Sequence, residues 1–154
     1  MIVKGIIDED FVNYRVPSMT IMFPNCTFKC GKEYCQNSMV AESEDIEIPV
    51  ESLCKRYMDN PITSAVVLQG LEPMDDYAYV LEIVMILRGM GCHDDIVIYT
   101  GYNKSEIADK ISELATYENI VIKYGRFIPD HVPHFDPVLG VELASSNQYA
   151  ERIS

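Results

Sequence analysis

Three of the five cysteines in this sequence lie within ten positions of one another. Cys26, Cys30 and Cys35 follow the short apolar run 20–23, which Pro24 ends. Three thiolates in a single loop can ligate three irons of a [4Fe–4S] cluster and leave the fourth iron without a protein ligand. Such an iron is open to a Lewis base from a substrate or a cofactor. The spacing of the three cysteines therefore favours an iron–sulfur site directly after a strand.

Two other interpretations of the cysteines stay open, a zinc site and thiols that merely pack in the core. A zinc site with three cysteines requires a fourth ligand and usually contains closely spaced C-x2-C pairs, which this segment lacks. The histidines available as a fourth ligand are all distant in the sequence: His93, His131 and His134. The other two cysteines fit structural roles, Cys54 on the apolar stripe of a helix and Cys92 in a turn.

The composition excludes several classes of protein. Twelve basic residues against 24 acidic residues give a net charge of −12, which argues against nucleic acid or an anionic membrane as a partner. The odd number of clustered cysteines does not fit a secreted disulfide framework. Acidic residues 8–10 interrupt the N-terminus where a signal peptide would be apolar, so we expect a cytoplasmic protein.

The elements that must position the cysteine loop alternate between strands and helices. Continuous apolar runs predict strands buried on both faces, at 20–23, 65–68, 96–99 and 120–122. Apolar residues at helical spacing predict helices at 50–57, 75–88 and 103–114. This order predicts an α/β fold with a parallel sheet in one domain, residues 1–154. Because a closed eight-fold barrel takes ~250 residues, we expect a partial, open β/α barrel.

Three candidate segments each follow a predicted strand: the cysteine loop, Gln69–Pro73 and Thr100–Tyr102. The carboxyl ends of parallel strands meet at the same edge of a sheet, and ligands bind there. Gly70 would let the backbone approach a ligand closely, and Glu72 would accept hydrogen bonds from an ammonium group. We therefore expect one ligand site at this edge.

The cysteine loop resembles the cluster loop of radical S-adenosylmethionine (radical SAM) enzymes. The pattern of that superfamily is C-x3-C-x2-C with an aromatic residue before the last cysteine. Cys26 and Cys30 match it, and Tyr34 precedes Cys35, although the second interval here holds four residues instead of two.

Four further segments resemble one branch of the superfamily, the activating proteins of anaerobic (class III) ribonucleotide reductases. They occur in the family's order at 69–73, 96–102, 124–127 and 145–148. The sequence departs from the family at Leu71, where a second glycine is usual, and at 141–144, where an arginine and a glycine are usual.

The resemblance implies a partial β/α barrel that cleaves SAM reductively into methionine and a 5′-deoxyadenosyl radical, which takes hydrogen from a glycine of the reductase. It implies a [4Fe–4S] cluster on the three loop cysteines, with no catalytic side chain beyond the cluster. The implied SAM contacts are Tyr34, Gly70, Leu71, Glu72, Thr100 and Gly101. The implied partners are an anaerobic ribonucleotide reductase and a reduced flavodoxin or ferredoxin-type electron donor. The alternatives are another protein or peptide as substrate, or a non-catalytic iron–sulfur or zinc module.

Overall fold

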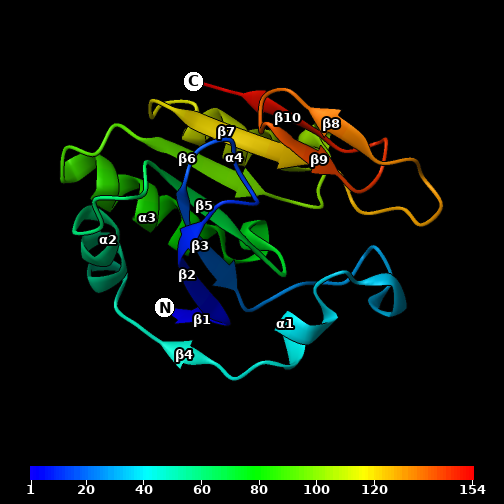
Figure 1. The fold of residues 1–154 in the computed structure, drawn as a ribbon, viewed down its shortest axis with the longest axis horizontal. Coiled ribbons are helices and arrows are strands. Elements are labelled where there is room, and N and C mark those ends of the chain that lie inside the picture. The colour runs from blue at the N-terminus through cyan, green and yellow to red at the C-terminus, as the bar shows by residue number, and fades with distance from the viewer.

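A six-stranded sheet forms the centre of the computed structural model, which describes residues 1–154 (Figure 1). The four central strands are parallel, and each edge strand is antiparallel to its neighbour. In spatial order the strands are β10 (Tyr149–Arg152), β7 (Ile120–Tyr124), β6 (Asp95–Tyr99), β5 (Ala65–Gly70), β3 (Ser18–Phe23) and β2 (Gly5–Asp10). The predicted α/β class is confirmed as a mixed fold with a mostly parallel sheet.

The parallel strands are the apolar runs of the sequence. They align in one register, with Met19 opposite Val66, Val66 opposite Ile96, and Ile96 opposite Ile120. These residues have at most 1% of their surface exposed, as expected for strands covered on both faces. All four predicted strands are therefore confirmed.

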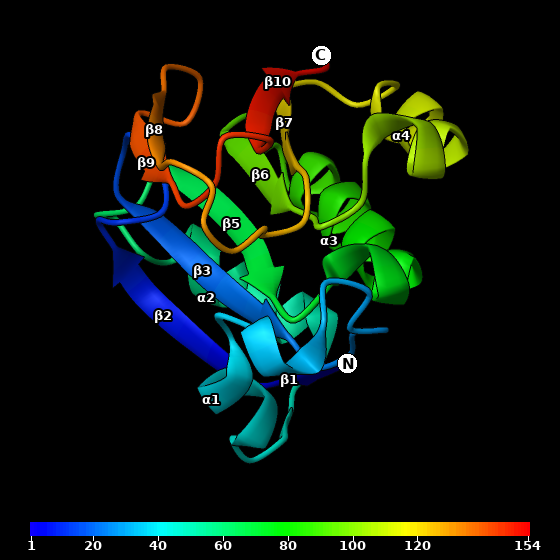
Figure 2. The same ribbon diagram turned by 90° about the vertical axis from the view of Figure 1, so that its right-hand side faces the viewer.

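Different structures cover the two faces of the sheet. The larger apolar cluster joins Ile96 and Ile120 to Leu53, Leu87 and Leu114 of the helices. These helices are α2 (Val50–Met58), α3 (Tyr77–Gly89) and α4 (Ala108–Leu114). Figure 2 shows α3 and α4 on one side of the sheet and the hairpin of β8 (His134–Asp136) and β9 (Val141–Leu143) on the other. On the hairpin side a smaller cluster packs Tyr14, Leu139 and Leu143 against the strands.

The predicted helices are present, with two local differences. Asn103 and Glu106 form a capping box, in which the Glu106 carboxylate accepts from the Asn103 amide at 2.8 Å, and this box opens a 3-10 turn (Lys104–Ile107) before α4. The predicted helix 75–88 begins instead as a 3-10 turn (Pro73–Asp76). Leu81, predicted on its apolar face, is only partly buried, because Ile83 fills the core position.

Several short elements did not follow from the apolar pattern. They include β1 (Ile2–Val3), β4 (Ile46–Glu47), β2, and the β8–β9 hairpin. Strand β10 directly follows the segment 145–148, so this segment leads into a strand. None of the helices combines the length and apolar composition needed to cross a membrane.

Candidate metal centre

A cavity of about 320 Å³ lies at the carboxyl ends of the parallel strands. The loops that follow β3, β5, β6 and β7 all line it, together with the β9 region and Gln148. Every site residue predicted from the sequence is among the lining residues, namely Cys26, Cys30, Cys35, Tyr34, Gly70, Leu71, Glu72, Thr100 and Gly101. The fold thus brings together segments that are up to 75 positions apart in the sequence.

The cysteine loop is held against the connection between β5 and α3. The Thr27 amide donates to Asp75 at 2.9 Å, and the Asn25 side-chain amide donates to Asp76 at 2.9 Å. At the far end of the loop, the Asn37 side-chain amide donates to the Gly70 carbonyl at 2.6 Å. Hydrogen bonds at both ends therefore fix the position of the three thiols relative to β5.

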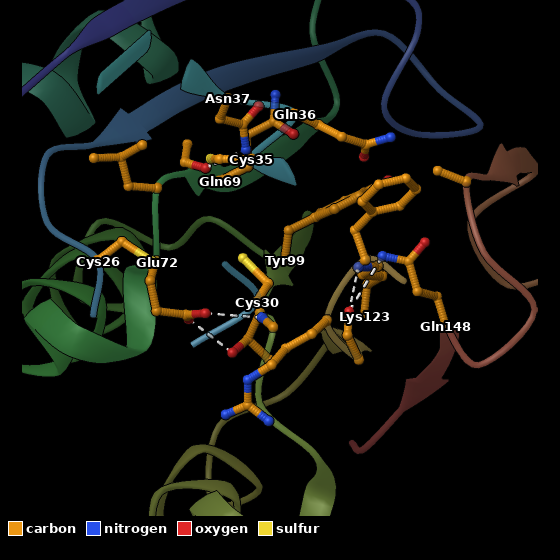
Figure 3. A pocket seen from close by; sticks show the side chains of 18 of the residues that line it. Cys26, Cys30, Cys35, Gln36, Asn37, Gln69, Glu72, Tyr99, Lys123 and Gln148 are labelled. Carbon is orange, nitrogen blue, oxygen red and sulfur yellow. Dashed lines mark hydrogen bonds between the residues drawn. The ribbon is translucent and has the colours of Figure 1, made fainter. Parts of the chain in front are cut away.

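The three loop cysteines are free thiols, and each is partly buried at the cavity wall (Figure 3). Burial raises the pKa of Cys26 to about 11 even though the Phe28 amide donates to its sulfur at 3.2 Å. Burial also raises the pKa of Cys30, and the neighbouring Cys35 adds to this effect. Since iron binds the thiolate, cluster assembly at these thiols releases protons.

The donor set fits an iron–sulfur cluster better than the zinc alternative. Three soft thiol ligands line one cavity, and neither a fourth cysteine nor a histidine lines it with them. His93 instead contacts Glu118, and His131 contacts the Ser146 hydroxyl, both at the surface. No group of three or more His, Cys, Asp or Glu side chains is arranged to hold a metal ion, so the preference for a cluster rests on the donor types and on the lack of a fourth zinc ligand in the cavity. The histidines considered as a fourth zinc ligand therefore do not reach this site.

Glu72 connects the ends of β5 and β6. Its carboxylate accepts hydrogen bonds from the Thr100 hydroxyl at 2.7 Å, the Gly101 amide at 2.8 Å and the Met74 amide at 3.1 Å. The side chain is almost fully buried, and this desolvation raises its pKa despite the three donors. A carboxylate has about four acceptor positions, so one remains for a ligand ammonium group.

Gly70 has a different role from the one its sequence context suggested. Its φ of +107° lies in the region that favours glycine. A Cβ atom here would lie 2.6 Å from the Phe23 amide nitrogen and 2.9 Å from the Met22 carbonyl carbon. The space was expected to admit a ligand, but the backbone of β3 occupies it.

Gly70→Ala is therefore expected to lower the free energy of unfolding by about 3 kcal/mol, because strain in φ adds to a backbone clash. Urea titration of the purified protein measures this. Gly89→Ala is the control, since a Cβ atom there would have no other atom within 4 Å and the φ of Gly89 is not positive. Equal stability of the two variants would show that β3 can shift to accommodate the methyl group.

Tyr34, Leu71 and Thr100 occupy different depths. Tyr34 is about half exposed at the rim, in the 3-10 turn Lys32–Tyr34, whereas Thr100 is buried beside Glu72. The Leu71 amide donates to the Phe23 carbonyl at 3.2 Å, which continues the contact between β5 and β3. Of these residues Tyr34 is the most exposed and lies at the cavity mouth.

The cavity lining also includes residues that were not predicted as site residues, among them Tyr99, Lys123, Arg126 and Gln148. Tyr99 and Lys123 are the polar positions that interrupt otherwise apolar strands near their carboxyl ends. Strand alternation places both on the face opposite the helices. A polar residue near the carboxyl end of an apolar strand was therefore the sequence signal that could have identified Tyr99 and Lys123 as cavity residues.

The tail segment Ser145–Gln148 packs on the loop that follows β7. The Gln148 side-chain amide donates to the Gly125 carbonyl at 3.2 Å, and the Asn147 side-chain amide donates to the Arg126 carbonyl at 2.8 Å. Gly125 has a φ of +97°, and a Cβ there would lie 3.0 Å from the Asn147 carbonyl oxygen. Two of the segments with family resemblance therefore form one wall of the cavity.

A cysteine-lined cavity at the carboxyl edge of a mostly parallel sheet is the arrangement of an iron–sulfur protein with an α/β fold. A family model described as "4Fe-4S single cluster domain" matches residues 15–148. The match covers most of the chain, so the protein belongs to this family and contains a [4Fe–4S] cluster-binding domain. A comparison with curated proteins finds no match.

Proposed function

We propose that the protein is a radical SAM activase, which cleaves SAM reductively and generates a glycyl radical on an anaerobic ribonucleotide reductase. One observation carries this proposal. The cysteine loop and all the segments that resemble the activases, 69–73, 96–102, 124–127 and 145–148, contribute residues to a single cavity. Three of these segments follow parallel strands and so meet at one edge of the sheet. The fourth, 145–148, is held at the same cavity by its hydrogen bonds to the loop after β7.

In this proposal the cluster ligands are Cys26, Cys30 and Cys35, and the sheet is the partial β/α barrel of the superfamily. A reduced cluster would supply the electron that cleaves the C5′–S bond of SAM. The protein side chains then bind SAM and orient it toward the cluster. Glu72, beside Leu71, accepts from the SAM ammonium group, and Gly70 shapes the turn that holds both residues. Tyr34 flanks the adenine at the rim, and Thr100 and Gly101 lie near the adenine.

The surroundings of the cavity favour a macromolecular substrate. Val12 lines the cavity and is 75% exposed, and its neighbour Phe11 is 65% exposed. In the tail, outside the cavity lining, Val132 and Phe135 are 72% and 64% exposed. Exposed apolar side chains of this size suit a protein interface. A docked protein would also shield a radical from water. A reduced flavodoxin or ferredoxin-type protein is the proposed electron donor.

The test is anaerobic reconstitution with iron and sulfide, followed by reduction and addition of SAM and the reductase. We expect 5′-deoxyadenosine and methionine in the supernatant and the doublet electron paramagnetic resonance (EPR) signal of a glycyl radical on the reductase. SAM cleavage without a glycyl radical would leave another protein or peptide as the substrate. A reconstituted cluster without any SAM cleavage would identify a non-catalytic iron–sulfur module.

A further inference from the structure

Lys123 is a buried cation in the wall of the cavity. It is the penultimate residue of β7 and only 7% exposed. Its neighbours Ile122 and Tyr124 belong to the apolar cluster on the helix side, so the Lys123 side chain lies on the opposite face, where it lines the cavity. Figure 3 shows it beside Gln148, on the other side of the cavity from Cys26 and Glu72.

The protein gives this ammonium group little compensation. Its Nζ donates to the Gly125 carbonyl at 3.0 Å and lies 5.9 Å from the centre of the Tyr99 ring. The same carbonyl also accepts from Gln148. An ammonium group has three donors, and no carboxylate lies within ion-pair distance of this one. Two donors are therefore left without a protein partner.

The other cations that line the cavity are already engaged. Arg126 forms two hydrogen bonds of 2.9 Å to the Glu106 carboxylate, and Lys29 lies over the ring of Tyr102 at 5.0 Å. Lys123 differs in being both buried and unpaired. Its burial lowers its pKa to about 8, although the charge of Glu72 across the cavity opposes this, so at neutral pH most molecules still carry the charge. A buried charge without a partner is costly, which makes a purely structural role a poor explanation.

We propose that Lys123 binds a carboxylate group of the molecule on which the protein acts. The proposal rests on the proposed function and narrows its substrate class to molecules with a carboxylate near the reacting glycine, such as an acidic side chain or a chain terminus. Glu72, the predicted contact of the SAM ammonium group, lies on the other side of the cavity from Lys123 in Figure 3, whereas the Thr100 amide donates to the Lys123 backbone carbonyl at 2.8 Å. The Lys123 ammonium group therefore faces the part of the cavity away from Glu72, which we assign to the second molecule. A single ammonium group across the cavity from Glu72 suits a monoanion better than a phosphate, which usually binds several N–H groups.

Two variants of Lys123 and one control variant distinguish the effect of its charge from the effect of its side-chain packing. Lys123→Met removes the charge but keeps the length of the side chain, and Lys123→Arg keeps the charge. Lys104→Met removes a lysine that pairs with Glu151 outside the cavity. All three proteins are reconstituted with the cluster, and their iron content is measured first, so that loss of the site is detected independently.

The first measurement uses acetate as the probe and requires no SAM. We expect 100 mM acetate, compared with chloride at equal ionic strength, to raise the thermal midpoint of the wild-type protein by about 2–4 °C. The Lys104→Met control should show the same rise, Lys123→Arg should retain part of it, and Lys123→Met should lose it. An equal response of wild type and Lys123→Met, or no response in either, would overturn the carboxylate site.

The second measurement identifies the source of the carboxylate. Binding of SAM and of decarboxylated SAM is compared in wild type and Lys123→Met by calorimetry. We expect the substitution to leave both affinities unchanged. A tenfold loss confined to SAM would show that Lys123 holds the carboxylate of SAM itself and would overturn the assignment to the second molecule. If no variant binds SAM, the proposed function fails, while the acetate measurement still decides the role of Lys123.

Discussion

Replacement of any one of Cys26, Cys30 and Cys35 by alanine is expected to abolish the iron–sulfur cluster. The three thiols line one cavity, and no other cysteine or histidine lines it to take the place of a lost ligand. Two remaining thiolates would hold a [4Fe–4S] cluster too weakly to survive purification. Iron and sulfide analysis, the visible absorption of the reconstituted protein and the EPR signal of the reduced protein measure the loss.

The matched controls are Cys54→Ala and Cys92→Ala. Both side chains are buried in the helix-side apolar cluster, and neither lines the cavity. Burial raises the pKa of Cys54 to about 12, as expected for an inert core thiol. Both variants should retain the full iron content. A cluster that persists in Cys35→Ala would show that a residue other than Cys35 is the third ligand. Loss of the cluster in Cys54→Ala would contradict the proposed ligand set.

The stability of the protein should depend on the titration of Lys123. The pKa of this lysine falls from 10.5 in the unfolded chain to about 8 in the folded protein. Between these values the unfolded state binds more protons, so stability rises with pH. A difference of this size corresponds to about 3 kcal/mol, which is gained as the pH rises from 8 to 10.5 and is missing below pH 8.

Urea titrations of the cluster-free protein from pH 7 to pH 10.5, in wild type and Lys123→Met, isolate this contribution. The difference in unfolding free energy between the two proteins should change by about 3 kcal/mol over this range, in favour of the wild type at high pH. At pH 7 the methionine variant should be the more stable protein, because it buries no charge. The exposed Lys104→Met change should produce no comparable trend. A difference independent of pH would mean that the Lys123 ammonium group is solvated.

The parallel strands were predictable because burial on both faces leaves a continuous apolar run, as in Val66, Val67 and Leu68 of β5. The edge strands were not, because they carry polar residues on their open sides. Strand β2 contains the acidic run 8–10, and β10 contains Glu151 and Arg152. Only the pairing of these segments with β3 and β7 identifies them as strands, and pairing is a long-range property.

The site also has features that could be predicted from the sequence and features that could not. The rule that loops meet at the carboxyl ends of parallel strands was sufficient to group the cysteines with Glu72 and Thr100. It did not reveal that β3 fills the space beside Gly70, because this contact depends on how closely the paired strands β3 and β5 approach each other at Phe23 and Gly70. The same rule did not predict Lys123 and Gln148 as site residues. These two side chains meet because both donate to the Gly125 carbonyl, although they come from distant segments of the chain.

The acidic edge of the sheet has a consequence for how the protein behaves at high concentration. Strand β2 presents Asp8 and Glu9 on the outermost strand, on a chain with a net charge of −12. Two copies that met edge to edge through β2 would bring like charges together, which opposes the strand pairing that begins aggregation. Arg56 pairs with Asp8, but Glu9 has no such partner, so added salt, by screening the repulsion, would weaken the protection. We therefore expect electrostatic repulsion to keep the molecules apart at an edge whose backbone groups would otherwise be available to another chain.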